Sequence, residues 1–181
     1  NRICGTLVCE GEYRRGTLYL TEFAQKFSIN NSLMVFYALA TARHKTALFH
    51  SAVIKHEGYG YMFLGKSGTG KSTHARLWLE NIEGTELLND DNPVVRVFDN
   101  EIRVFGSPWS GKTPCYKNDS CALGGIVLLS QAPYNKIERL RGIEAYAALV
   151  PSISGKRWDK QIADGLHETE NALAMRVPTW Y

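Results

Sequence analysis

One short stretch constrains this chain more than any other, the segment Gly65–Ser72, which reads GKSGTGKS. It matches the pattern G-x-x-x-x-G-K-[ST] at every fixed position, with an apolar run before it and a helix-like run after it. At average residue usage, such a match arises by chance in roughly one chain of this length in two hundred. Glycine adopts φ values closed to other residues and lets the backbone approach a ligand closely. The segment therefore predicts a phosphate-binding loop between a strand and a helix.

Each part of this segment suits a triphosphate. Successive backbone N–H groups converge into an anion site, and the start of the following helix adds its unpaired N–H groups. Lys71 can bridge the β- and γ-phosphates, and the Ser72 hydroxyl can hold Mg²⁺. We therefore expect ATP and Mg²⁺ as cofactors. The residues expected to contact the nucleotide are Gly65, Lys66, Ser67, Gly68, Thr69, Gly70, Lys71, Ser72 and Thr73.

A pair of aspartates, Asp90 and Asp91, follows the strand-like run ELL, 19 residues after Lys71. A helix of ten or so residues rises about 15 Å, so a strand that returns beside the first brings this pair near the phosphates. One carboxylate can help Ser72 to hold Mg²⁺, and the other can accept the proton of an attacking hydroxyl. The surrounding NDDNP is also typical of a solvated turn. Beside the glycine segment, the functional interpretation is favoured.

The remaining patterns predict one strand-rich α/β domain over residues 1–181. Ser51–Ile54 and Tyr59–Leu64 flank the polar KHEG and predict a hairpin whose second strand enters the glycine segment. A second hairpin is predicted around a turn at Asp99–Asn100. Because hairpin strands are antiparallel, we expect a mixed sheet. Further strands are predicted over 3–9, 17–21, 86–88 and 125–129, and helices over 32–43, with Ser32 as N-cap, 73–81, 142–150 and 158–175.

Composition excludes several classes of protein. The 21 basic and 18 acidic residues give a net charge of +3, which does not indicate a nucleic-acid or membrane partner. No apolar run reaches the ~20 residues of a membrane-spanning helix. The spacing of Cys4, Cys9, Cys115 and Cys121 lacks the two-residue gap of zinc sites and predicts reduced or buried thiols, with a disulfide or a metal site as the alternative. We expect a cytoplasmic protein, and a homo-oligomer is left open. The start at Asn1 and the strand-like ending MRVPTWY indicate trimmed ends.

The stretch FHSAVIKHEGYGYMFLGKSGTGKST, followed by ELLNDD, resembles the kinase domain of HPr kinase/phosphorylase. SGTGKST also resembles phosphoenolpyruvate carboxykinase, which is related in fold. GSPWSGK (106–112) and ALGGIVLLSQAPYNKIERL (122–140) are similar to segments of HPr-kinase-related proteins. The resemblance implies a mixed α/β fold and Mg²⁺-assisted transfer of the ATP γ-phosphoryl group to a hydroxyl. The acceptor it implies is a serine of a protein or peptide, or a small molecule.

The resemblance also implies a role for His50, which matches a histidine near the transferred phosphate; taken alone, His50 reads as a packed strand-end residue. Trp109 and Lys112 can face the acceptor or the nucleotide, or can belong to a surface loop. Lys66 and Thr73 stand where HPr kinase typically has acidic residues. The sequence therefore does not identify the acceptor or predict a phosphorylase activity.

Two classes of function remain. One is a kinase that acts on a hydroxyl, with Lys71, Asp90, Asp91 and His50 as catalytic residues. The alternative is a nucleotide-binding regulatory or accessory module with little or no turnover. The intact set of Lys71, Ser72 and the aspartate pair favours the kinase, because a binder without activity often loses one of them. A transport ATPase would need an LSGGQ-like segment, and the sequence has none.

Overall fold

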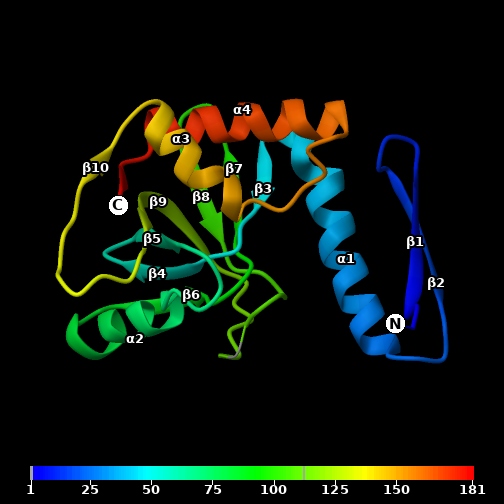
Figure 1. The fold of residues 1–181 in the computed structure, drawn as a ribbon, viewed down its shortest axis with the longest axis horizontal. Helices are drawn as coiled ribbons and strands as arrows, with labels where there is room; N and C mark the ends of the chain where they lie inside the picture. The colour runs from blue at the N-terminus through cyan, green and yellow to red at the C-terminus, as the bar shows by residue number, and fades with distance from the viewer. Residues whose placement is uncertain (1, 112) are drawn as a thin grey trace.

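The structure is a computed structural model and describes residues 2–111 and 113–181 (Figure 1). Its elements in chain order are β1 (Gly5–Glu10), β2 (Arg15–Leu20), α1 (Gln25–Thr41), η1 (Ala42–His44), β3 (Thr46–Leu48), β4 (Ala52–His56), β5 (Tyr59–Leu64), α2 (Lys71–Asn81), β6 (Glu86–Asn89), β7 (Val94–Val97), β8 (Ile102–Phe105), β9 (Ser120–Leu128), β10 (Arg139–Leu140), α3 (Ile143–Leu149), η2 (Val150–Ser152), α4 (Lys160–Arg176) and β11 (Thr179–Trp180). The predicted strands and helices are present, although several begin or end at other residues.

Within the described residues, nine strands form one sheet, whose main path runs β3-β7-β8-β9-β5-β4-β6. β5 and β9 are parallel, whereas β4 and β5, and β7 and β8, form antiparallel hairpins. The β4–β5 turn consists of Glu57 and Gly58, whose φ values of 49° and 81° suit the tight turn that a two-residue hairpin requires. The predicted mixed sheet is confirmed. β11 pairs in parallel with β9 and antiparallel with β10.

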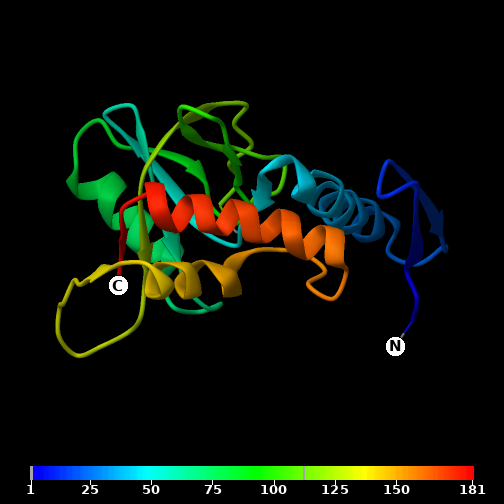
Figure 2. The same ribbon diagram turned by 90° about the horizontal axis from the view of Figure 1, so that it is seen from above.

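Side chains of β5 alternate between two cores, because successive residues of a strand point to opposite faces of the sheet. Met62 and Leu64 belong to the larger core, which includes Leu166 of α4. Phe63 belongs to a smaller core with Ala75 of α2. α4 and α2 therefore cover opposite faces of the sheet (Figures 1 and 2). Buried side chains on both faces fix the strand that enters the glycine segment.

The start of α1 differs from the prediction. The helix begins at Gln25, its N-cap position is Ala24 with a φ of 52°, and no side chain caps it. The N-cap assigned to Ser32 is therefore wrong. The additional turns pack against the β1–β2 hairpin, which forms a separate two-stranded sheet. The contact is close, since a Cβ added to Gly5 of β1 would lie 3.5 Å from the Cβ of Ser28. Burial of Ser28 under the hairpin extends the helix, because tertiary packing supplies most helical stability in proteins.

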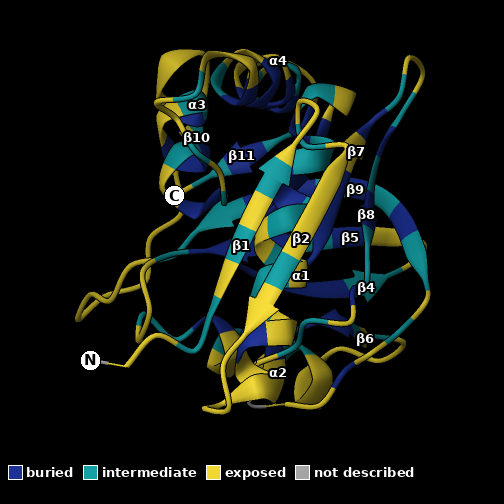
Figure 3. Cartoon of the chain, turned by 90° about the vertical axis from the view of Figure 1, so that its right-hand side faces the viewer, coloured by how far each residue is buried: buried dark blue, intermediate teal, exposed yellow. Residues whose placement is uncertain are grey.

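Figure 3 shows this hairpin in front of α1, largely exposed on its outer side.

Two other predictions concern the chain as a whole. All four cysteines are free thiols, as predicted, with Cys115 and Cys121 buried. In the part of the chain that the structure describes, no helix combines the length and apolar character needed to cross a membrane.

Candidate functional site

The glycine loop, residues 65–70, joins the end of β5 to the start of α2. Gly65, Gly68 and Gly70 have φ values of 147°, 83° and 104°, a region that residues with a side chain rarely adopt. A Cβ built on Gly65 would also lie 3.1 Å from the carbonyl oxygen of Leu129, so the loop passes close to the end of β9. The Thr69 hydroxyl donates to the Lys66 carbonyl at 2.7 Å. Glycine is thus required at the positions where the pattern places it.

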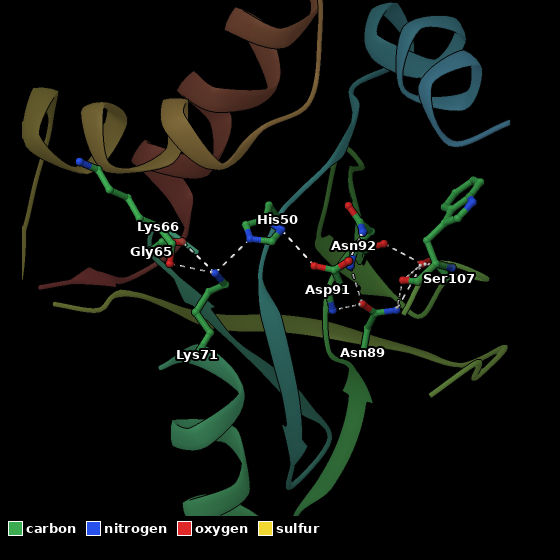
Figure 4. Close-up of polar contacts among 9 residues, drawn as sticks. His50, Gly65, Lys66, Lys71, Asn89, Asp91, Asn92 and Ser107 are labelled. Carbon is green, nitrogen blue, oxygen red and sulfur yellow. Dashed lines mark hydrogen bonds and ion pairs between the residues drawn. The ribbon is translucent and has the colours of Figure 1, made fainter. Parts of the chain in front are cut away.

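Lys71, the first residue of α2, is only 8% exposed. Its ammonium lies over the loop, where Nζ donates to the carbonyl oxygens of Gly65 at 2.9 Å and Lys66 at 3.3 Å (Figure 4). The Lys66 side chain points away from this ammonium. Burial lowers the pKa of Lys71, while the carboxylates of Asp91 and Asp90 act in the opposite direction. Lys71 is therefore a largely desolvated cation held by the loop that it follows.

His50 connects Lys71 to Asp91 (Figure 4). Nε2 of His50 lies 3.1 Å from Lys71 Nζ, and Nδ1 lies 3.0 Å from Asp91 Oδ1. Because an ammonium can only donate, Nε2 accepts from it, and a neutral imidazole then carries its proton on Nδ1 and donates to the carboxylate. The predicted residues His50, Lys71 and Asp91 thus form one hydrogen-bonded chain.

Asn89, at the end of β6, organises the aspartate pair and is not among the site residues predicted from the sequence. Its side chain is buried, and Oδ1 accepts from the backbone N–H groups of Asp91 at 2.9 Å and Asn92 at 2.8 Å. Its Nδ2 donates to Ser107 Oγ at 3.2 Å and to the Trp109 carbonyl at 3.3 Å. Asn89 therefore ties the pair to the segment after β8. The turn composition of NDDNP is a local signal for a side chain that accepts from the backbone, but it does not identify Asn89 as the link to the segment after β8.

The two aspartates have different surroundings. The Asp91 carboxylate accepts from His50 and, at 2.7 Å, from Asn92 Nδ2. Asp90 is 6% exposed, and within the described residues its buried Oδ2 has no hydrogen-bond partner. A buried carboxylate oxygen without a partner costs free energy. Within the described residues, Asp90 Oδ2 thus has unused acceptor positions, whereas both oxygens of Asp91 already accept hydrogen bonds.

A cavity of about 580 Å³, called the charged cavity below, brings most predicted site residues together. Its lining consists of His50, Ser67, Gly68, Gly70, Lys71, Ser72, Thr73, Asp90, Asp91 and, from the segment after β8, Gly111. Gly65, Lys66 and Thr69 instead line a neighbouring space of about 500 Å³, called the side cavity below, together with Ser67 and Gly68. The glycine loop therefore borders two spaces.

Trp109 does not line the charged cavity. Its ring packs against Tyr37 of α1, with ring centroids 5.5 Å apart, and it borders a small space of about 170 Å³ that also contacts Asp91. Lys112, the other residue predicted in this segment, lies outside the described residues. Of the two, only Trp109 is placed by the structure, at the side of Asp91 that faces α1.

Ser72, Asp90 and Asp91 offer the oxygen ligands that Mg²⁺ prefers. The unpaired Oδ2 of Asp90 fits such an ion, since it is a buried carboxylate oxygen of a residue that lines the same cavity as Ser72. Among residues 2–111 and 113–181, no group of three or more His, Cys, Asp and Glu side chains forms a metal site by itself. Mg²⁺ commonly binds through one or two carboxylates and substrate phosphates. The residues present therefore fit Mg²⁺ that enters with a nucleotide.

No protein-family model and no curated protein matches this chain. Among solved structures, the chain is similar to the Hpr(Ser) kinase/phosphatase from Coxiella burnetii, with 11% sequence identity and a TM-score of 0.37. The matched region covers 54% of this chain and 73% of that one. A likeness this distant carries no argument about activity. Function is therefore inferred from the residues of the charged cavity.

Proposed function

We propose that this chain is an ATP- and Mg²⁺-dependent kinase that transfers the γ-phosphoryl group to a hydroxyl of a protein, peptide or small molecule. The observation that carries the proposal is the charged cavity, onto which the glycine loop, Lys71, Ser72 and both aspartates open. Phosphoryl transfer depends mainly on positioning the reactants and on neutralising negative charge. The charged cavity is lined by glycine backbone, by the Lys71 ammonium and by the carboxylates of Asp90 and Asp91, and these groups suit this chemistry. The same residues carry the resemblance to HPr kinase/phosphorylase.

The glycine loop and the first turn of α2 would bind the phosphates. The first N–H groups of a helix have no partner within the helix, and no side chain in the described part of the chain caps α2, whose N-cap is Gly70. The ammonium of Lys71 adds a full positive charge beside these groups. A phosphate next to Lys71 would raise the pKa that burial lowers, because an opposite charge favours the ionised form. Nucleotide binding and the charge of Lys71 would therefore support each other.

Asp90 and Ser72 would hold Mg²⁺ together with the phosphates, and the bound ion would supply charge neutralisation at the β- and γ-phosphates. We assign the direct contact with Mg²⁺ to Asp90 rather than to Asp91, because Asp90 Oδ2 has no other partner within the described residues. Asp91 stands beside it and, through His50, is linked to the lysine at the loop.

Asp91 would accept the proton of the attacking hydroxyl. His50 and Asn92 hold its two oxygens in a fixed orientation, and a carboxylate has about four acceptor positions, so room for a third donor remains. General-base catalysis typically contributes 10²–10⁴-fold in rate, and we expect Asp91 to contribute a factor of about that order. The role is thus a moderate one, added to the larger effect of phosphate positioning.

The test is incubation of the purified protein with γ-labelled ATP, Mg²⁺ and an extract of its host, followed by identification of what becomes labelled. Lys71→Ala is the inactive control, and Lys160→Ala, an exposed lysine at the start of α4, is the matched control that should label as wild type. ATP binding without transfer to any acceptor would favour the regulatory nucleotide-binding module instead. Absence of ATP binding would reject both functions.

A further inference from the structure

The side cavity adjoins the charged cavity across the glycine loop, since Ser67 and Gly68 border both. Its other walls are the end of β9 and the residues that follow, 128–131, and Tyr181. Within the described residues, no acidic side chain lines this space. A third space, of about 360 Å³, continues along Leu128–Ser130 and Tyr181 as far as Trp78 of α2. A ligand with phosphates in the charged cavity thus has beside it a space whose one charged lining side chain, among the described residues, is the cation Lys66.

Gln131 fastens this wall to the glycine loop. Its side-chain Nε2 donates to the carbonyl of Gly68 at 3.3 Å. Gln131 follows β9, which pairs in parallel with β5 from Tyr59 to Leu64. In open α/β sheets, ligands bind outside the carboxyl ends of the strands, and β5 and β9 are a parallel pair that ends at this point. The side cavity therefore lies at the end of the sheet where ligands bind in folds of this kind.

Tyr181 supplies an aromatic ring at the same place. Its backbone exchanges two hydrogen bonds with Glu138, at 2.8 and 2.6 Å, and its hydroxyl lies 2.8 Å from Ser130 Oγ. The ring is therefore fixed at both ends, yet the residue remains 45% exposed and borders both the side cavity and the third space. Exposed aromatic rings held in this way serve as stacking surfaces for nucleobases.

One wall of the third space is formed by aromatic side chains. His74, in the first turn of α2, packs edge-on against Phe63 with ring centroids 4.6 Å apart. Its Nε2 accepts a hydrogen bond from Trp78 Nε1 at 3.3 Å. Burial lowers the pKa of His74 from its ordinary value, which favours the neutral ring. These rings can border a planar base but cannot replace Lys71 as a phosphate ligand.

We propose that the side cavity binds the base and ribose of the nucleotide, with the ring of Tyr181 as the stacking surface, while the charged cavity binds the phosphates. This assignment rests on the proposed nucleotide-binding function and adds the part of the site that distinguishes a nucleotide from an inorganic polyphosphate. The glycine loop is the wall common to the two halves.

The experiment compares two probes by calorimetric titration of the purified protein, Mg²⁺–ATP and Mg²⁺–tripolyphosphate. Tripolyphosphate lacks base and ribose and reports on the charged cavity alone. Wild type is expected to bind ATP about tenfold more tightly or better, the order that one base–aromatic stack contributes. Tyr181→Ala should lose this advantage with tripolyphosphate affinity unchanged, and Tyr181→Phe should keep it. Tyr59→Ala, 52% exposed at the far end of β5, is the matched control.

The possible results distinguish failure of the nucleoside site from failure of the kinase proposal. Equal ATP affinity in wild type and Tyr181→Ala, or equal affinity of wild type for the two probes, would overturn the nucleoside site and leave the kinase proposal intact. Failure of wild type to bind either probe would overturn both. Circular dichroism and thermal melting check that each variant is folded. If Tyr181→Ala does not fold, Tyr181→Leu, which keeps an apolar side chain without an aromatic face, carries the same expectation.

Discussion

Lys71 Nζ lies 3.1 Å from His50 Nε2, although the two residues stand 21 positions apart in the chain. The other nitrogen of the same ring lies 3.0 Å from Asp91 Oδ1. A cation, an imidazole and a carboxylate are therefore aligned across one cavity. A change at any of the three alters the electrostatic environment of the other two.

Lys71→Ala is expected to abolish phosphate transfer and to weaken ATP binding. Among the described residues that line the charged cavity, Lys71 is the only lysine or arginine, so the variant removes that positive charge. The fold should remain, since burial already disfavours the ammonium and its loss removes that desolvation penalty. Calorimetry with ATP, the label-transfer assay and a thermal melt measure the three properties. Unchanged ATP affinity and transfer in the variant would sink the assignment of the loop.

Asp90→Asn and Asp91→Asn should behave differently, because only Asp90 has a buried oxygen without a partner in the described structure. Asp90→Asn is expected to weaken the Mg²⁺ dependence together with the rate. Asp91→Asn should lower the rate by about 10²–10⁴-fold with ATP affinity almost unchanged, as loss of a general base does.

Titrations of rate against Mg²⁺ concentration, with ATP affinity measured in parallel, separate these two effects. The opposite pattern, with Mg²⁺ dependence lost in Asp91→Asn, would reverse the assignment of the two roles. Full activity in both variants would reject the kinase and favour the regulatory module.

Asn89→Ala is expected to destabilise the protein by about 2 kcal/mol, because it leaves the backbone N–H groups of Asp91 and Asn92 without their acceptor. Transfer should slow as well, since the aspartate pair loses its support. Urea unfolding and the transfer assay measure both. Asn171→Ala, an exposed residue of α4, is the matched control. Loss of stability with a normal rate would show that Asn89 supports the fold without positioning the pair.

Tyr146 should make the stability of the folded protein depend on pH in the alkaline range. Burial and a hydrogen bond of 2.7 Å to Glu170 raise its pKa to about 12 from an ordinary value of 10.0. Above pH 10 the unfolded chain loses this proton while the folded chain keeps it, so the contribution to stability is complete below pH 10 and is lost as pH rises toward 12.

Tyr146→Phe cannot ionise at this position. The free energy of unfolding should therefore fall less in Tyr146→Phe than in wild type between about pH 9 and about pH 11. Tyr116→Phe, at an exposed position, should follow wild type. Parallel curves for wild type and Tyr146→Phe would contradict the raised pKa.

The sequence was most informative where neighbours in the chain determine the conformation. The positive φ values of Gly65, Gly68 and Gly70 follow from a pattern of adjacent residues, and the turn at Glu57–Gly58 follows from the polar break between two apolar runs. The spacing from Lys71 to the aspartate pair reflects one helix and one returning strand. In each of these cases a short window contains the whole physical cause.

Other features depend on elements that are distant in sequence. Asn89 acts because β6 ends beside the segment that follows β8, and His50 acts because the segment after β3 passes between the loop and the aspartates. The early start of α1 depends on a hairpin that buries Ser28. The place of Tyr181 depends on the parallel pairing of β11 with β9. No local periodicity contains these pairings, so the sequence alone could not predict them.

The parallel pairing of β5 with β9 also determines when, during translation, the glycine loop can gain its neighbouring strand. The glycine loop leaves β5 at Gly65, but the strand that supports it on one side spans Ser120–Leu128 and leaves the ribosome later. Chains emerge from their N-terminus, and pairing between distant parallel strands is slow. Until β9 has been translated and paired, the loop lacks its neighbour at Leu129. A nascent chain would therefore complete the proposed nucleotide site only after translation has passed this strand.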